Sequence, residues 1–198
     1  MSYVLWDLAK TSDDQIVWIS QDCKDDLYCV ECSGKMIPVK GEIKQHHFRH
    51  SSEGNCSGES AQHWSKKYEI HQTLEKIGSS AVEGAIGKFY ADVLFEKEWA
   101  FEVVYSNPPS EEKMNALKER LIIFNFNDDC WGDDIGGLLE GRSLEEMVTY
   151  IATSILKGNT PDVCSNCREV KGWMSRLKSN REYGPCCMPC DFDWFCRN

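Results

Sequence analysis

Cysteine usage is the feature that most constrains how this chain can fold. The 198 residues include 11 cysteines, which gather towards the two ends of the sequence and almost avoid its middle. In a reducing compartment, cysteines at CxxC spacing are typical of metal sites rather than of disulfides. An odd number would also leave one thiol unpaired in a disulfide framework. We therefore expect two zinc-binding modules that flank a central domain.

The first cysteine cluster combines a CxxC pair with a histidine-rich segment at residues 46–50. Two thiolates and two imidazoles are a suitable ligand set for tetrahedral Zn²⁺. The expected ligands are Cys29, Cys32, His47 and His50. His46 and Cys56 remain alternatives for one of the four positions. The competing interpretation is a hairpin with incidental cysteines and a solvent-exposed run of histidines.

Two further CxxC pairs lie near the C-terminus at the spacing of a zinc ribbon. The expected zinc ligands there are Cys164, Cys167, Cys187 and Cys190, with Cys186 and Cys196 as alternatives. The residues between the pairs are mainly basic and include a tryptophan, so they can hold a phosphate backbone and stack on a base. The expected nucleic-acid-binding residues are Arg168, Lys171, Trp173, Arg176, Lys178 and Arg181. The alternative is a solvated loop in which the tryptophan packs on the zinc site.

Between the modules, the sequence predicts elements in the order α-β-β-β-α-β. Apolar residues recur at helical spacing in the first segment, and Ser110 caps the second helix. The predicted helices cover residues 59–77 and 111–120, followed later by a helix over 144–157 that Ser143 opens with a capping box. The predicted strands cover residues 81–83, 89–95, 99–105 and 121–126. A hairpin is also expected near the N-terminus, with its turn at residues 11–14.

Two carboxylates of this central segment fall within apolar strands. Alternation should place Asp92 with Tyr90 and Leu94 on one face of its strand, opposite Phe89, Ala91, Val93 and Phe95. Glu102 lies in the next strand of the predicted hairpin. Neighbouring carboxylates repel each other unless a cation lies between them, and Mg²⁺ or Mn²⁺ prefers such oxygen ligands. The alternative is that one acid faces solvent or pairs with Lys66 or Lys88.

Composition and charge limit the classes of protein that fit. Hydrophobic residues make up 41% of the chain, which is enough for a core and excludes general disorder. The sequence contains no apolar run of membrane-spanning length, and its start has no secretory signal, so we expect a cytoplasmic protein without membrane partners. The net charge of −10 argues against non-specific coating of nucleic acid. A local basic patch or a bound metal would still allow DNA or RNA as substrate.

The order of these motifs resembles the competence CoiA-like family over about residues 25–126. The resemblance rests on the first CxxC pair, the segment His47-Phe48-Arg49-His50, and the later Ala91-Asp92-Val93 and Lys118-Glu119-Arg120. It also rests on Glu59, His63 and Lys67, spaced along the first central helix, and on the run from Phe101 to Ser106. Family members are predicted nucleases with a PD-(D/E)XK core, and the resemblance covers about half of the chain.

The resemblance implies an α+β fold with a restriction-endonuclease-like αβββαβ core. The expected domains are an N-terminal β-rich zinc module (residues 1–57), the nuclease-like domain (58–158) and a C-terminal zinc ribbon (159–198). The implied activity is Mg²⁺- or Mn²⁺-dependent hydrolysis of phosphodiesters, with DNA as the expected substrate. The implied catalytic residues are Asp92, Glu102, Glu59, His63 and Lys67, with Glu69 as an alternative to Glu59. His63 has a second interpretation as a core or capping histidine.

The chain departs from the family pattern at one position. Two residues beyond Glu102, where the family carries Lys or Gln, this chain has Val104. Valine can neither orient water nor stabilise developing charge. Lys88, Lys67 or Ser106 could take that role. The second hypothesis is therefore a catalytically inactive zinc-binding adaptor that binds nucleic acid or a protein, and the third is a zinc-dependent regulator with the central domain as scaffold.

Overall fold

The computed structural model describes residues 5–22, 25–43, 45–52, 54–56, 59–105, 107–126, 143–161 and 163. The fold is mixed α+β, as the sequence predicts, and it divides into two compact units, residues 1–66 and 67–198. The boundary between the units falls within α1 (Ala61–Glu75), and each unit is described here by itself. The predicted C-terminal zinc ligands, from Cys164 to Cys190, and the basic residues from Arg168 to Arg181 lie outside the described residues.

The N-terminal unit is built on a five-stranded antiparallel sheet with the order β2-β1-β3-β4-β5. Its strands are β1 (Leu8–Lys10), β2 (Ile16–Trp18), β3 (Leu27–Tyr28), β4 (Lys35–Val39) and β5 (His47–His50). The sheet curls, because Trp6 before β1 pairs with Phe48 of β5 and accepts its backbone N–H at 2.6 Å. The buried side chains that this curled sheet encloses include Trp6, Leu8, Leu27, Met36 and Phe48.

The predicted N-terminal hairpin is present as the antiparallel pair β1 and β2, with its turn at residues 11–15. Thr11 closes the turn twice, because its N–H donates to the Gln15 carbonyl and its hydroxyl accepts the Gln15 N–H at 3.2 Å. Asp14 has a φ of 57°, a left-handed conformation that Asp tolerates better than most residues. The hairpin thus depends on local side-chain chemistry at the turn.

The second unit places its elements in the predicted order α-β-β-β-α-β. After α1 come β6 (Ser80–Ile86), β7 (Phe89–Phe95) and β8 (Trp99–Val104), then α2 (Glu111–Leu117), the short 3₁₀ helix η1 (Lys118–Arg120) and β9 (Leu121–Asn125). The helix α4 (Leu144–Leu156) follows later in the chain. The sheet has the order β6-β7-β8-β9. Its first three strands form an antiparallel meander, and β9 lies parallel to β8 because α2 carries the chain back across the sheet.

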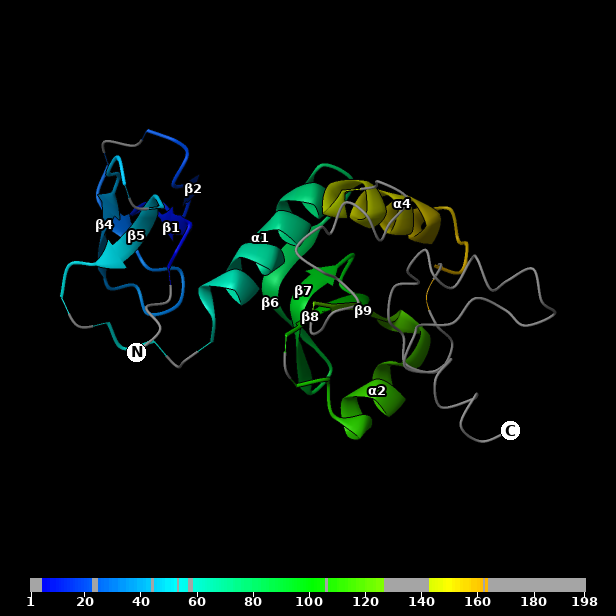
Figure 1. Ribbon diagram of the computed structural model, residues 1–198. Coiled ribbons are helices and arrows are strands. Elements are labelled where there is room, and N and C mark those ends of the chain that lie inside the picture. Colours follow the sequence, from blue (N-terminus) through cyan, green and yellow to red (C-terminus); the bar gives the residue numbers. More distant parts are fainter. Residues whose placement is uncertain are drawn as a thin grey trace, which may run out of the picture. The chain divides into compact units, whose positions relative to one another are not determined.

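Helices cover both faces of this sheet, as Figure 1 shows. On one face, Ile70 and Leu74 of α1 and a stripe of α4 pack against Phe101, Phe124 and neighbouring strand residues. On the other face, Leu117 and Met114 of α2 pack against Leu121 and other strand residues. A strand that is buried on both faces carries apolar residues at nearly every position, which explains the continuous run in β9. Any charged group inside this sheet must therefore find a partner.

Local sequence sets the ends of these elements. Ser110 caps α2 and Ser143 opens α4 with the predicted capping box. Glu96 and Lys97 turn the chain between β7 and β8 with φ values of 51° and 59°. None of the helices in the described part of the chain has the length and apolar character needed to cross a membrane.

Candidate functional site

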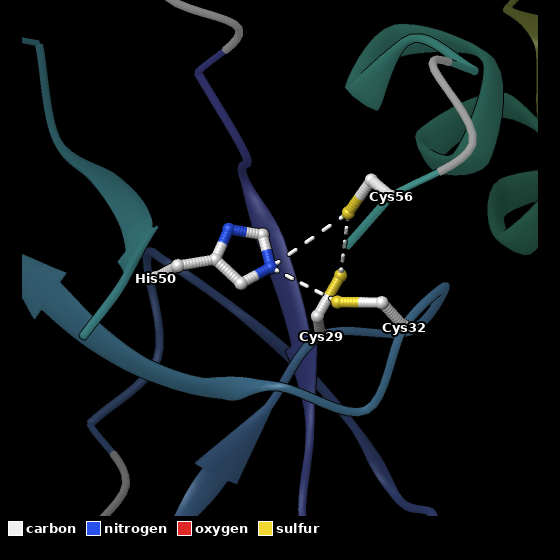
Figure 2. Close-up of side chains that lie close together, drawn as sticks. All are labelled: Cys29, Cys32, His50 and Cys56. Atoms are coloured by element: carbon white, nitrogen blue, oxygen red, sulfur yellow. Dashed lines mark hydrogen bonds between the residues drawn. The ribbon is translucent and has the colours of Figure 1, made fainter. Parts of the chain in front are cut away.

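The first candidate site is a cluster of three cysteines and one histidine in the N-terminal unit (Figure 2). Its members are Cys29, Cys32, His50 and Cys56, whose ligand atoms all lie within 4.8 Å of one another. The Sγ atoms of Cys29 and Cys56 are 3.7 Å apart, and His50 Nε2 lies 3.3 Å from Cys32 Sγ and 3.7 Å from Cys56 Sγ. A tetrahedral ion with bonds of about 2.3 Å to sulfur separates two sulfur atoms by about 3.8 Å. The group can therefore hold a metal ion such as zinc.

The backbone around the first two cysteines forms a tight turn that presents both thiols to the same point. The Cys29 N–H donates to the Gly34 carbonyl at 2.8 Å, and the Ser33 N–H donates to the Cys29 carbonyl at 3.0 Å. Ser33 has a left-handed φ of 57°. This turn links β3 to β4, so the sheet itself fixes the direction of the two sulfur atoms.

Two glycines make room for the His50 ring. A Cβ atom on Gly54 would lie 2.6 Å from the ring, and one on Gly34 would lie 3.2 Å from it. A side chain at residue 54 would therefore displace the imidazole from the three thiols. The Trp6 ring also packs against His50 in an edge-to-face arrangement, with ring centroids 6.4 Å apart. The histidine is thus held in place by its surroundings.

The thiols of this cluster titrate in different directions. Burial raises the pKa of Cys32, but the Gly34 N–H, His50 and the neighbouring thiols outweigh burial and bring that pKa down to about 7. Burial is the main cause that raises the pKa of both Cys29 and Cys56. The other two thiols add to the rise in pKa for Cys56, whereas backbone N–H groups and the Cys56 thiol oppose it for Cys29. Several thiolates are not stable this close together without a cation, and a bound metal would deprotonate all three.

The structure corrects the predicted ligand set at one position, because Cys56 and not His47 joins the group. His47 and His50 are three residues apart in β5, and side chains at odd spacing in a strand point to opposite faces. The His47 Nδ1 atom instead contacts the Gln45 carbonyl at 2.8 Å. The sequence had offered Cys56 only as an alternative, and the missed signal is that an HxxH pair in a strand cannot converge on one ion.

The second candidate site lies where β7 and β8 separate. Their backbone pairs run from Phe95 with Trp99 to Val93 with Phe101 and stop before Asp92 and Glu102. Beyond that point, side-chain carboxylates accept the backbone N–H groups. The Val103 N–H donates to Asp92 Oδ2 at 2.8 Å, and the Asp92 N–H donates to Glu102 Oε1 at 3.3 Å. The two acids therefore face each other across the gap between neighbouring strands.

The strand β7 also changes its packing at Asp92, which corrects the predicted alternation. Phe89 and Ala91 pack with the smaller core cluster, whereas Val93 and Phe95 belong to the larger one on the other face. On the β6 side, Glu83 opposes Asp92 with a left-handed φ of 52°. Among the described residues, the pairs before and after this position are regular and this one is missing. At this irregularity the Asp92 carboxylate accepts the Val103 N–H and pairs with Lys67.

Two lysines hold the acidic pair, one from each helical layer. Lys67 of α1, whose side chain is 2% exposed, contacts Asp92 Oδ1 at 3.0 Å and also pairs with Glu83. Lys113 of α2 contacts Glu102 Oε2 at 2.6 Å and the Tyr90 carbonyl at 2.6 Å. Burial and the Asp92 charge raise the pKa of Glu102 to about 7, although Lys113 opposes that rise. The site is thus a compact network of alternating charges.

The remaining predicted residues divide into two sets. Glu59 Oε1 and His63 Nδ1 form an ion pair at 2.6 Å at the start of α1, and the His63 N–H donates to the Ser60 hydroxyl. Because α1 is continuous, His63 lies one turn before Lys67 on the same helix face. Lys88, by contrast, pairs with Glu112 at the exposed surface, and Ser106 lies outside the described residues.

Sequence reasoning missed Lys113, although a signal was present. It is the third residue of α2, and a positive charge near a helix N-terminus is unfavourable unless it has an acidic partner. A lysine there, next to a strand that carries a misplaced glutamate, favours an ion pair between the two. Val104, at the position where the family carries Lys or Gln, is 5% exposed and packs in the smaller core cluster.

No protein-family model matches the chain, and neither the curated proteins nor the solved structures give a significant match. The geometry of the two sites is therefore the basis on which a function can be inferred.

Proposed function

We propose that this protein is a divalent-metal-dependent nuclease that hydrolyses phosphodiesters, with DNA as substrate, in the manner of the CoiA-like family. The observation that carries the proposal is the pair Asp92 and Glu102, held face to face by two neighbouring strands where backbone pairing stops. The order α1-β6-β7-β8-α2-β9, with β8 parallel to β9, agrees with the restriction-endonuclease-like core that the resemblance implies.

The donor set suits Mg²⁺ or Mn²⁺. These ions prefer oxygen ligands, and a carboxylate oxygen can accept more than one bond at a time. A bound ion would supply Lewis-acid activation of the phosphate and of the attacking water. Lys67 and the Val103 N–H would hold the Asp92 carboxylate in a fixed orientation. The resemblance also implies catalytic roles for Glu59 and His63, which form an ion pair with each other at the start of α1.

The proposed role of zinc is structural. Cys29, Cys32, His50 and Cys56 would hold one Zn²⁺ ion and fix the turn between β3 and β4. A second Zn²⁺ ion would be held by the predicted C-terminal ribbon, and the basic residues of that ribbon would bind the DNA backbone. With a net charge of −10, the chain needs such a local basic segment, or a bound metal, to approach DNA.

A second candidate function is an inactive adaptor for nucleic acid or for a protein partner. The observation that favours it is that Asp92 and Glu102 each have a lysine partner, so part of their negative charge is balanced without a metal. The buried Val104 in place of a polar residue is a further argument for it.

A cleavage assay separates the two functions. The zinc-loaded chain is incubated with single- and double-stranded DNA and RNA in Mg²⁺ or Mn²⁺, beside Asp92→Asn and Glu102→Gln, which keep the side-chain volumes. We expect wild-type cleavage and a loss of about a thousandfold in either variant, the size of the several kcal/mol that a catalytic metal supplies. The matched control is Glu145→Gln, an exposed acid paired with Lys76.

Equal cleavage by the wild type and both acid variants would assign the activity to another site or to a contaminant. An absence of cleavage on every substrate, by folded protein with zinc bound, would favour the adaptor.

A further inference from the structure

Of the two lysines at the acidic pair, Lys113 is the more accessible to a substrate. Its side chain is 14% exposed, whereas Lys67 at the same site is 2% exposed and enclosed by two carboxylates. Lys113 donates to Glu102 Oε2 and to the Tyr90 carbonyl, both at 2.6 Å. Within the part of the chain that the structure describes, these bonds use two of the three ammonium protons, and the third has no acceptor.

Three further observations favour a role in chemistry over a role in stability. Lys113 lies in the first turn of α2, where the helix dipole disfavours a positive charge. It also reaches the acidic pair from α2, on the sheet face opposite the core that α1 and α4 cover. Val104 stands where the CoiA-like family carries Lys or Gln, and it is buried in the smaller core cluster.

We propose that Lys113 is a catalytic residue of the nuclease reaction, whose ammonium group contacts the scissile phosphate beside Glu102 and stabilises the negative charge that develops on it. This inference rests on the proposed nuclease function. In the step concerned, the water oxygen forms a bond to phosphorus, the bond from phosphorus to the ester oxygen breaks, and the ester oxygen leaves with the electron pair. The proton from water passes to solvent, and the leaving oxygen takes one up. Lys113 transfers no proton, because its contribution is electrostatic.

The same position makes Lys113 a competitor of the divalent ion. An ammonium group and a metal ion at Glu102 repel each other, so a lysine that acts on the phosphate must also weaken metal binding. A lysine that only holds Glu102 in place would do the opposite, since its loss would disorganise the metal ligands. If Lys113 acts on the phosphate, replacing it should raise metal affinity and lower turnover. If Lys113 only holds Glu102 in place, replacing it should lower both.

The test measures Mn²⁺ affinity by electron paramagnetic resonance and kcat for DNA cleavage on the same zinc-loaded full-length proteins. For Lys113→Gln we expect kcat to fall about 100-fold, as for loss of one donor to developing charge, while Mn²⁺ binds about tenfold more tightly. Lys113→Arg keeps the charge and should retain more cleavage than Lys113→Gln. Lys76→Gln is the matched control, because Lys76 forms an exposed ion pair with Glu145.

Three outcomes would overturn the inference while the wild type cleaves DNA. These are unchanged kcat in Lys113→Gln, a fall of Mn²⁺ affinity together with kcat, and an equal loss in the Gln and Arg variants. A wild type that binds Mn²⁺ but cleaves nothing would instead overturn the proposed nuclease function, and this inference with it.

Discussion

At the scale of single residues, the Cys₃His cluster depends on Cys56, which adds a fourth ligand to the three that the sheet positions. Cys29 and Cys32 come from the turn after β3 and His50 from β5, so the sheet brings three ligands together. Cys56 comes from the segment after β5, and its Sγ atom lies 3.7 Å from both Cys29 Sγ and His50 Nε2. The fourth ligand therefore decides whether the group closes around a metal.

Replacing Cys56 should remove one bound zinc ion per chain at moderate chelator concentration. We expect this for Cys56→Ser, because three protein ligands leave an open coordination position and hold the ion less tightly than a closed Cys₃His set. Zinc content after dialysis against a chelator, measured by elemental analysis, checks the prediction.

The matched control is His47→Ala, because His47 belongs to the same strand as His50 and contacts the Gln45 carbonyl instead of the cluster. Its zinc content should equal that of the wild type. If His47→Ala lost the ion and Cys56→Ser kept it, the ligand set argued from the structure would be wrong.

His71 gives the second prediction at this scale. Its Nδ1 atom lies 3.0 Å from the Ser80 hydroxyl, and Glu75 lies 3.5 Å from Nε2. Burial lowers the pKa of His71 below its ordinary value of 6.5, and the Glu75 charge opposes this only in part. The folded protein therefore binds fewer protons at His71 than the unfolded chain does as the pH falls.

The contribution of His71 to stability should be present above pH 6.5 and should be lost as the pH falls below that value. Urea unfolding of the wild type and of His71→Gln between pH 7.5 and pH 5 tests this. The variant keeps a polar group near Ser80 but cannot titrate, so the wild-type free energy of unfolding should decline relative to it. Curves that stay parallel would contradict the prediction.

At the scale of elements, Ser143 caps the N-terminus of α4 and stabilises its first turn. The Ser143 hydroxyl accepts the Glu146 N–H at 3.2 Å, and Glu146 Oε2 accepts the Ser143 N–H at 2.8 Å. The helix that begins there buries Met147, Val148, Ile151, Ala152 and Ile155. A weaker start therefore loosens a whole layer over the sheet.

Ser143→Ala should lower the free energy of unfolding by about 1 kcal/mol, since it removes the side-chain partner of a helix N–H. Urea denaturation followed by far-ultraviolet circular dichroism measures the change. Ser154→Ala in the same helix is the control and should be neutral or slightly stabilising, because alanine is the better residue inside a helix. An equal loss in both variants would show that the cap contributes nothing.

The elements were the part of the structure most accessible from sequence, for a physical reason. The strand β7, the N-cap at Ser110 and the capping box at Ser143 depend on neighbouring residues, so periodicity and cap chemistry predict them. The face change at Asp92 and the left-handed Glu83 are different, because they arise from contacts between strands and leave no local pattern. Local rules predicted where Asp92 lies in the chain but not which way it turns.

At the scale of the whole molecule, contacts made within a short stretch of sequence could be predicted, whereas contacts between distant elements could not. Asp92 and Glu102 were predicted together because one short turn joins their strands, which makes their pairing a local event. The place of Lys113 near the start of α2 is a local signal for an acidic partner, but the identity of that partner depends on how α2 packs against the sheet. Spacing alone favours His47 as a zinc ligand, but the geometry of strand β5 turns its side chain away from that of His50.

The missing backbone pair at Asp92 has a consequence for spectroscopy. The amide protons of Asp92 and Val103 are bonded to side-chain carboxylates and not to the carbonyls of a sheet ladder. Their chemical shifts and hydrogen-exchange rates therefore depend on the charge and the position of those two carboxylates, whereas the amides of the regular rungs on either side do not. In a nuclear magnetic resonance spectrum, these two resonances are intrinsic reporters of whatever ion or phosphate reaches the acidic pair.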